Sequence, residues 1–447
     1  MSNNFVFKAL IGAFLFFIFF NEGYSQSISS ISEERYIYLH SHPELSGKET
    51  NTAQYLKSTI SQMGYTVVDS LGFHSFAGVL KNGKGPVVMY RTDMDALPLT
   101  EQTGASFAPG TDVRSTEPIV GMHACGHDVH MTTWLEVAEY MMQHKKLWKG
   151  TLILLAQSSE ETGQGARAVL SSENLNKLPN TDYQIAFHNT PELTSGTVGF
   201  CDQYAFAAVD MLNITIKGKG GHGAEPYRAV DPVLLSAYFI TELQSIVSRN
   251  LPPNDPAVIT VGAINGGTVG NIIPSEVALK LTIRSYSEAS RKVIFQRLEE
   301  IGNGIAASAG LDSTDYPHFD LLDMSIPSVF NNPEMGKLLY NTMLANEIPT
   351  ATMSPKMIGE DFGVYGQVQN QSSYMLWIGT RAEDMENCPE PESCAVPKLH
   401  TATYLPDYKL AIPMASNAMC KALVTLFDNR PSKVTHDVAP SLIETNH

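Results

Sequence analysis

The sequence predicts an α/β protein whose main domain is built on a mostly parallel β-sheet. Three short apolar segments, at residues 86–90, 151–156 and 183–187, are interpreted as buried strands. Between the first two, residues 129–143 carry apolar side chains at helical spacing, so strand and helix alternate along the chain. This alternation is typical of a parallel sheet with helices on its faces.

A polar cluster follows each of these three strands at the point where the strand ends. Arg91-Thr-Asp-Met-Asp95 follows the first strand, Gln157-Ser-Ser-Glu-Glu161 the second, and His188 the third. Ligands of such sheets bind beyond the carboxyl ends of the strands. We therefore expect the three clusters to face one binding site at one edge of the sheet.

A tripeptide, Cys125-Gly126-His127, adds a thiol and an imidazole to these donors, and His400 adds a second imidazole. Thiolate, imidazole and carboxylate form the ligand set of borderline-soft divalent metals. Taken alone, the tripeptide could also hold a thiol nucleophile with its base, or be ordinary loop. Glu160-Glu161 and His188 favour a metal site, because the surrounding donors would bind metal first.

Several neighbouring polar residues have simpler interpretations. Asp128 could cap the helix that follows it, or lie behind the metal ligands. Asp93 and Asp95 could form turns or orient a ligand histidine. His123 and His130 are expected to be structural or to lie behind the ligands. None of these five is predicted as a ligand.

Composition indicates an enzyme-sized globular protein. The chain has 447 residues, of which 43% are hydrophobic and 17% charged, which suggests two or three domains with large cores. The formal net charge is -16 and the pI about 5.2. Nucleic acid and anionic membrane are therefore not expected as partners.

The amino terminus resembles a secretion signal. Lys8 precedes a 12-residue apolar run, residues 9–20, and Gly23-Tyr-Ser25 suits signal-peptidase cleavage before Gln26. Twelve residues are too few to cross a bilayer, which needs about 20. We expect a signal peptide at residues 1–25, export to the periplasm or the medium, and no stable membrane anchor.

Export gives the cysteines added interest, because paired thiols oxidise outside the cytoplasm. Cys388 and Cys394 flank a short polar loop and could form a disulfide. Cys201 and Cys420 are expected to be buried, small and apolar in character.

An inserted domain is predicted at residues 207–322. Its segments follow the order strand, helix, strand, strand, helix, strand, which is the ferredoxin-like order. The predicted strands are residues 210–217, 257–262, 277–284 and 316–321, and the helices are residues 231–249 and 288–307. Residues 26–206 and 323–432 then form the two parts of the main, catalytic domain, and residues 433–447 a flexible tail.

Six motifs, in order along the chain, resemble a known family. They are Arg91-Thr-Asp-Met-Asp-Ala-Leu-Pro98, His123-Ala-Cys-Gly-His-Asp128, Gln157-x-x-Glu-Glu161, Gly220-Gly-His-Gly-Ala224, Gly267-x-x-x-Asn-Ile-Ile-Pro274 and Gly359-Glu-Asp-Phe362. The sequence is similar to the dinuclear amidohydrolases of the aminoacylase and carboxypeptidase superfamily. That group includes hippurate hydrolases, N-acyl-amino-acid hydrolases and plant auxin-conjugate hydrolases. The resemblance covers nearly everything after residue 30.

The resemblance implies two divalent metal ions per subunit, with zinc, manganese, cobalt or nickel all compatible with the donors. The ligands implied are Cys125 bridging both metals, His127, Glu161, His188 and His400. Glu160 is implied as the general base that takes a proton from water and returns it to the leaving amine. Since neighbouring side chains of an extended segment point in opposite directions, the two glutamates can divide these tasks.

Further residues are assigned by resemblance in the inserted domain. His222 would stabilise the transition state from the partner subunit, which implies a homodimer. Asn271 and Arg284 would bind the substrate carboxylate. The sequence departs from the family around the glutamates, where Ser158-Ser159 replaces the usual Pro-Ala, and after His400.

The function expected is metal-dependent hydrolysis of the amide bond in an N-acyl amino acid. A metallo-dipeptidase or carboxypeptidase with the same site is an alternative, with a short peptide as substrate. A binding protein that captures acyl-amino acids without cleaving them is a third possibility.

Overall fold

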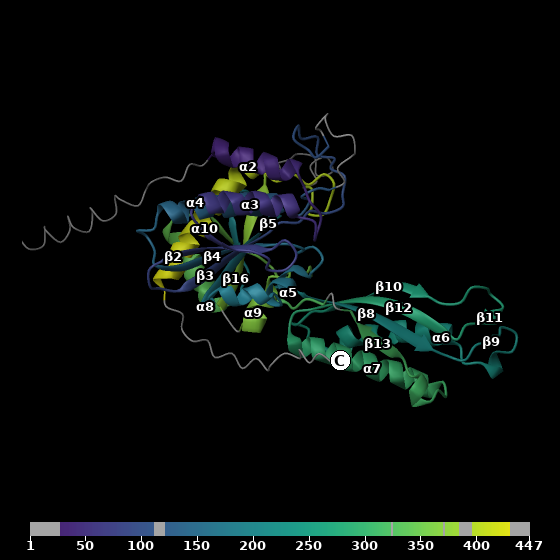
Figure 1. The fold of residues 1–447 in the computed structure, drawn as a ribbon. Helices are drawn as coiled ribbons and strands as arrows, with labels where there is room; N and C mark the ends of the chain where they lie inside the picture. Colours follow the sequence, from purple (N-terminus) through teal and green to yellow (C-terminus); the bar gives the residue numbers. More distant parts are fainter. Residues whose placement is uncertain (1–26, 111–120, 323–324, 370–371, 384–395, 430–447) are drawn as a thin grey trace, which may run out of the picture.

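The computed structural model of the protein describes residues 27–110, 121–322, 325–369, 372–383 and 396–429. A large domain lies beside an elongated second domain that projects from it (Figure 1).

The large domain is built on an eight-stranded, mostly parallel sheet in the order β1-β2-β4-β3-β5-β16-β6-β15. The four central strands, β4, β3, β5 and β16, are mutually parallel, whereas β1 and β2 join their neighbours in antiparallel pairs. Strand β6 is antiparallel to β16 and parallel to β15. The bounds are Thr66–Val68 for β1, Phe76–Asn82 for β2, Val87–Asp93 for β3, Gly150–Gln157 for β4, Tyr183–Thr194 for β5, Val198–Phe200 for β6, Thr350–Thr352 for β15 and Ser372–Arg381 for β16. The predicted α/β fold class is confirmed.

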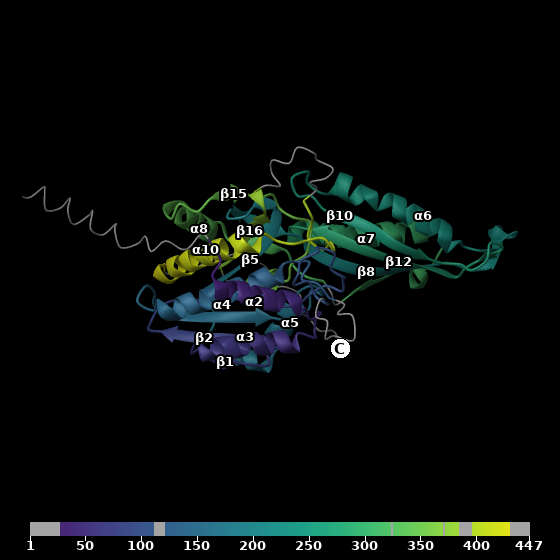
Figure 2. The same ribbon diagram turned by 90° about the horizontal axis from the view of Figure 1, so that it is seen from above.

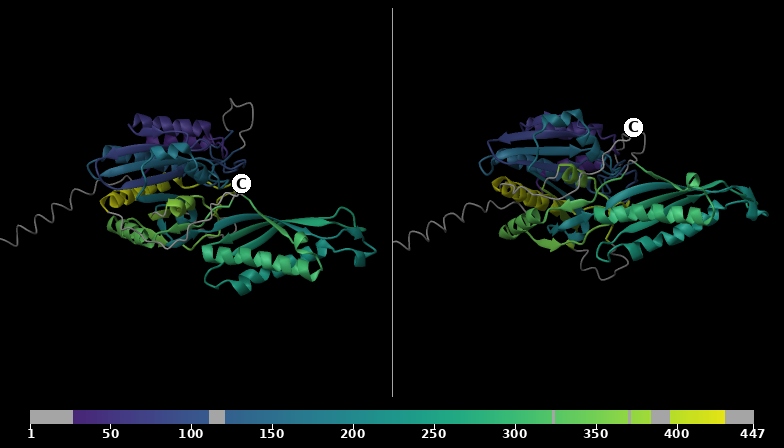
Figure 3. Two further views of the ribbon diagram at one scale, coloured as in Figure 1. Left: turned by 60° about the horizontal axis from the view of Figure 1, so that its bottom comes forward. Right: turned by 90° about the horizontal axis from the view of Figure 1, so that it is seen from below.

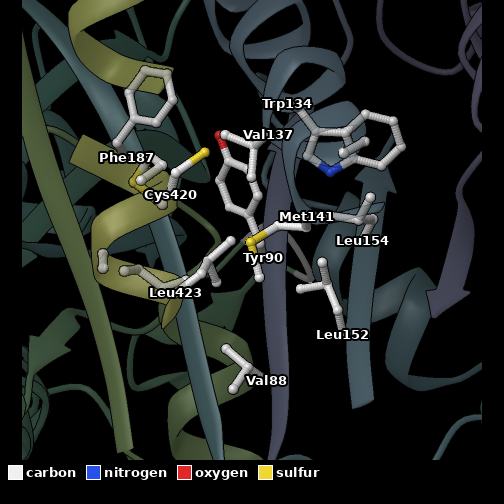
Figure 4. Packing of buried hydrophobic residues seen from close by; sticks show 14 of the residues in the cluster. Val88, Tyr90, Trp134, Val137, Met141, Leu152, Leu154, Phe187, Cys420 and Leu423 are labelled. Atoms are coloured by element: carbon white, nitrogen blue, oxygen red, sulfur yellow. The ribbon is translucent and has the colours of Figure 1, made fainter. Parts of the chain in front are cut away.

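Helices cover both faces of this sheet because its central strands are apolar on both sides. Val88 and Tyr90 of β3 contribute to one core, whereas Met89 between them contributes to the other. The first core also contains side chains from α2 (Ser30–Ser41), α3 (Thr50–Gln62), α4 (His127–Gln143), α8 (Pro333–Ala345) and α10 (Tyr408–Asp428). The second contains side chains from α5 (Gly165–Leu170) and α9 (Gly363–Gln369). Figure 4 shows Tyr90, Trp134 and Leu423 packed together in the first core.

The second domain contains an antiparallel four-stranded sheet in the order β10-β12-β8-β13. Along the chain its elements are β8 (Ala208–Lys217), α6 (Pro232–Glu242), β10 (Val258–Asn265), β12 (Glu276–Ser285), α7 (Glu288–Ser308) and β13 (His318–Leu321). Strand β12 alternates buried and exposed residues, since α6 and α7 cover one face of the sheet (Figure 2). The elements follow the predicted order, and the boundaries at 207 and 322 remain predictions.

A short two-stranded ribbon lies at the far end of the second domain. It pairs β9 (Gly221–His222) with β11 (Ile272–Ile273). Figures 1 and 3 show this ribbon at the tip, away from the large sheet. Helix α6 is shorter than the predicted helix 231–249, because it ends at Glu242 and a separate π-helical turn, Ile246–Asn250, follows.

The signal-peptide prediction needs correction. No signal peptide is evident, because residues 1–25 lie outside the residues that the structure describes. The prediction of export rested on that segment and gains no support. The predicted disulfide between Cys388 and Cys394 and the tail at 433–447 also lie outside the described residues. Cys201 and Cys420 are buried, as predicted.

Helix α10 is long and apolar enough to cross a membrane by length and composition alone. However, 67% of its apolar window is buried inside the protein, where Ala415, Met419 and Leu423 belong to the first core. Its apolar character is therefore explained by packing against α4, α8 and the sheet.

Candidate metal centre

The five predicted metal ligands come from four separate segments and meet at the carboxyl ends of the parallel strands. Cys125 lies in the loop before α4, and His127 is the first residue of that helix. Glu161 follows β4, and His188 lies within β5. His400 belongs to the loop that precedes α10 and is held by its backbone N–H, which donates to the carbonyl of Ala124 at 2.8 Å.

Distances between donor atoms show that these residues form one cluster. The Sγ atom of Cys125 lies 3.4 Å from Nε2 of His188 and 3.2 Å from Nε2 of His400. Glu161 Oε1 lies 3.4 Å from Nε2 of His400 and 3.9 Å from Nε2 of His127. Donors of Cys125, His127 and His188 all lie within 4.8 Å of one another. The structure thus brings together every residue predicted as a ligand.

In His127 and His188, the ring nitrogen that faces away from the cluster is already hydrogen-bonded. Nδ1 of His127 donates to the backbone carbonyl of Asp95 at 2.8 Å, and Nδ1 of His188 donates to that of Asn189 at 2.7 Å. These bonds leave Nε2 of each ring as a metal donor. Nε2 of His127 and Oε1 of Glu161 are buried and have no hydrogen-bond partner among the described residues. Buried polar atoms need partners, and a metal ion would satisfy both.

The electrostatics of these groups also favour a bound cation. Burial, and then Glu161 and Glu160, raise the pKa of the Cys125 thiol well above its ordinary value. The pKa of Glu160 is also raised well above its usual value, first by burial and then by Glu360 and Glu161. Burial lowers the pKa of His127, but Asp93 and Asp95 outweigh it and raise that pKa to about 10. A bound cation would displace these protons and compensate the carboxylates, so the residues fit a metal site.

Glu160 lies at the border of the cluster and is 8% exposed. Its Oε2 atom is 3.8 Å from Nε2 of His127, and its other close neighbours are Glu360 and Asp361. Among the described residues, no lysine or arginine forms an ion pair with Glu160 or Glu161. Arg91 instead pairs with Asp93, Glu360 and Asp361.

A buried glutamate supports the loop that carries Glu160. Glu49 accepts hydrogen bonds from Oγ of Ser158 at 2.5 Å and from the backbone N–H of Ser159 at 2.8 Å. Ser159 has φ +61°, in the left-handed region that is unfavourable for most residues. The contacts of Glu49 hold this conformation and position the glutamate that follows, so the loop is constrained although Ser158 stands where the resemblance implies a proline.

Comparison with known proteins agrees with this site. Residues 89–405 match the model of peptidase family M20/M25/M40. The chain belongs to this peptidase family. An N-acetyldiaminopimelate deacetylase from Limosilactobacillus reuteri (strain DSM 20016) is 33% identical over 380 residues, covering 83% of this chain and 92% of that protein. An N-acetyl-L-cysteine deacetylase from Bacillus subtilis (strain 168) is 33% identical over 329 residues, covering 73% and 76%. The chain is thus an amidohydrolase, as predicted.

The fold comparison points to the same M20 family. The crystal structure of a dinuclear metal-binding peptidase of the M20 family from Bacillus subtilis matches with a TM-score of 0.74 and 26% identity. The match covers 89% of this chain and 98% of that chain. Divalent metal ions are consistent with this family and with the clustered donors described above.

The three functional residues predicted in the second domain of this M20 protein lie outside the cluster of candidate metal ligands. His222 is exposed in β9, and Asn271 directly precedes its partner strand β11, so the two lie side by side at the tip. Arg284 lies near the opposite end of β12, where a Cβ added at Gly359 would come within 3.5 Å of its guanidinium. Within one chain, the contacts of the described residues do not bring His222 or Asn271 to the metal cluster.

Several residues of the site escaped prediction because no local pattern marks them. Glu49 supports the Glu160 loop from more than 100 positions away in the sequence. His40 is buried between Asp128 and Glu101, with Nδ1 2.7 Å from the first and Nε2 3.0 Å from the second. These groups come together only through tertiary contacts in the folded chain.

Proposed function

We propose that the protein hydrolyses the amide bond of N-acyl amino acids with two divalent metal ions and with Glu160 as the general base. One observation carries this proposal. Five donor side chains from four segments converge at one edge of the sheet, where Cys125, His127 and His188 are buried and His400 is exposed, and the carboxylate of Glu160 lies beside them. The relatives named above are N-acetyl-amino-acid deacetylases, which supports this substrate class.

Cys125, His127, Glu161, His188 and His400 would hold the metal ions. When bound, such ions polarise an amide carbonyl and lower the pKa of water toward about 7. The fixed hydrogen bonds of the His127 and His188 rings hold their donor atoms in place before metal enters. This arrangement reduces the ordering needed on binding.

Glu160 performs the proton transfers. Its carboxylate takes a proton from the attacking water and then gives that proton to the nitrogen of the leaving amine. Burial beside Glu360 and Asp361 gives the ionised form little solvation and makes it a stronger base. The positive charge of the filled site keeps the group ionised at neutral pH.

Arg284 is the candidate for binding the substrate carboxylate. Its side chain is half-buried, and the described residues offer it no ion pair or hydrogen bond. Burial alone lowers its pKa. A partly desolvated guanidinium without a protein carboxylate beside it favours an anionic ligand. Its position near Gly359 places it where the second domain meets the large domain.

We further propose a dimer in which the tip of one second domain completes the site of the partner subunit. His222 and Asn271 are exposed at the tip, where they contribute little to their own domain's core. The apolar side chains of Val233, Leu234 and Tyr238 are exposed on α6 and suit a contact between subunits. Mixing inactive Glu160→Gln and His222→Ala proteins should restore activity through heterodimers. Absence of activity after demonstrated subunit exchange would reject the shared site.

The proposed reaction is tested directly with metal-loaded protein. N-acetyl, N-benzoyl and indole-acetyl amino acids should be incubated with the enzyme beside dipeptides, and the released amino acid quantified. Hydrolysis of an N-acyl amino acid that stops with a chelator and returns with metal supports the proposal. Cleavage of dipeptides alone would favour the peptidase alternative, and activity unaffected by the chelator would favour a thiol nucleophile.

A further inference from the structure

A buried histidine behind the metal cluster connects two strands where they separate. Strands β3 and β5 are paired only as far as Tyr90 and Ile185, so their carboxyl ends diverge. His130 of α4 is 2% exposed and lies between these ends. Its Nδ1 is 2.7 Å from Oδ1 of Asp93 on β3, and its Nε2 is 3.1 Å from the backbone nitrogen of Asn189 on β5. The ring thus replaces backbone hydrogen bonds that the separated strands cannot form.

These two contacts define the protonation of the ring. The backbone N–H of Asn189 can only donate, so Nε2 of His130 must be the acceptor and carry no proton. Nδ1 must then carry the proton and donate it to the carboxylate of Asp93. His130 is therefore a neutral imidazole that accepts from one strand and donates to the other.

The peptide held by His130 is adjacent to a ligand. The carbonyl of Asn189 accepts the hydrogen bond from Nδ1 of His188 at 2.7 Å, and Nε2 of that ring lies 3.4 Å from Sγ of Cys125. Nε2 of His130 accepts a hydrogen bond from the N–H of Asn189, and the carbonyl of Asn189 fixes the orientation of the His188 ring. Resting on the proposed metal-dependent function, we propose that His130 is a positioning residue that aims His188 at the metal site through Asn189.

The side chain of Asn189 strengthens this connection. Its Nδ2 donates to the hydroxyl of Tyr404 at 2.6 Å, which fixes the amide. The amide packs against Gly126, which has φ +79°, and a Cβ added there would lie 2.5 Å from Nδ2. Gly126 separates Cys125 from His127, so Asn189 contacts the backbone between two ligands and aims a third. The position of Asn189 therefore affects three of the five donors.

Two substitutions separate the bonds of His130. The side-chain amide of glutamine reaches the position of Nε2, so His130→Gln can still accept from Asn189 but loses Asp93. The amide of asparagine reaches the position of Nδ1, so His130→Asn can still donate to Asp93 but loses Asn189. Each variant is the matched control for the other, since both replace the ring with a neutral amide.

The readout is metal affinity, which needs no substrate. Wild type and both variants are stripped of metal, checked for folding by circular dichroism, and titrated with Co²⁺ while the cobalt–thiolate absorption of Cys125 is followed. We expect His130→Asn to bind Co²⁺ about 10- to 100-fold more weakly, the range seen when an outer partner of a ligand is lost. His130→Gln should stay close to wild type.

Every other pattern overturns the inference. If His130→Gln is the weaker binder, His130 acts through Asp93; if both are weakened equally, neither bond is special; if neither is weakened, His130 does not position a ligand. A wild type that binds no Co²⁺ would instead reject the metal-dependent function itself. Should a variant fail to fold, nitrogen NMR of metal-free wild type decides: a protonated Nε2 on His130 contradicts the proposed arrangement.

Discussion

Arg91 is expected to carry a large share of the stability of the catalytic domain. Its guanidinium is completely buried and lies 2.7 Å from Asp93, 2.9 Å from Asp361 and 3.1 Å from Glu360. It also donates to Gln157 at 3.1 Å. Arg91→Leu keeps a shorter apolar side chain but leaves three buried carboxylates without their cation.

The expected loss is large compared with the stability of a domain. Removing one partner of a buried ion pair costs about 3 to 5 kcal/mol, because the other charge stays buried and unpaired. The total free energy of unfolding of a domain is only about 5 to 15 kcal/mol. Proton uptake by the unpaired carboxyl groups will offset part of this destabilisation. We therefore expect Arg91→Leu to lower the free energy of unfolding by at least about 3 kcal/mol at neutral pH.

The assay is urea unfolding of the metal-free protein, followed by tryptophan fluorescence. All three tryptophans, Trp134, Trp148 and Trp377, lie in the large domain, so the signal reports that domain. Arg35→Leu is the matched control, since Arg35 pairs at 3.2 Å with Glu139, which is 41% exposed. That control should cost less than about 1 kcal/mol. Equal losses in the two variants would refute the assignment of Arg91 as the buried counter-charge.

Three further predictions concern single residues. Cys125→Ser should lower both metal content and rate, and full occupancy by elemental analysis would remove Cys125 from the ligands. Burial lowers the pKa of His40, but hydrogen bonds to Asp128 and Glu101 raise it overall from 6.5 to about 9. Protonated His40 should therefore contribute about 3 kcal/mol to the free energy of unfolding below pH 6.5, and this contribution should disappear as the pH rises through about 9. In a pH series of unfolding curves, His40→Gln should abolish this pH dependence. Arg284→Ala should raise KM for N-acetyl amino acids but not for their carboxamides; an equal rise for both would exclude a carboxylate contact.

The fold of the large domain was predictable because local and tertiary preferences agree. The buried strands at Val87–Asp93 and Gly150–Gln157 are apolar on both faces, and α4 between them has helical spacing. Strand order was less accessible. Strand β2, which lies between β1 and β4, and the short β6 beside β16 join the sheet through contacts that neither segment specifies alone.

The cluster of candidate metal ligands was predictable for a similar reason, whereas the residues that support it were not. Donors that follow parallel strands must meet at one edge, so His188 and Glu161 could be placed without knowing the strand order. Glu49 binds the backbone of a distant segment, and Asn189 binds the distant His130 ring through its own backbone N–H, which leaves no pattern in the sequence. His222 was assigned by resemblance alone, and its place at an exposed tip explains why no local pattern indicated a role.

Glu160→Gln tests the central claim most directly, because it changes the proposed base and leaves the five proposed ligands intact. Metal content and the rate of N-acyl amino acid hydrolysis should be measured on the same preparation of this variant and of wild type. We expect two equivalents of metal in both proteins and a rate at least about 10²-fold lower in the variant. A variant that keeps the wild-type rate would contradict the role of Glu160 as the general base.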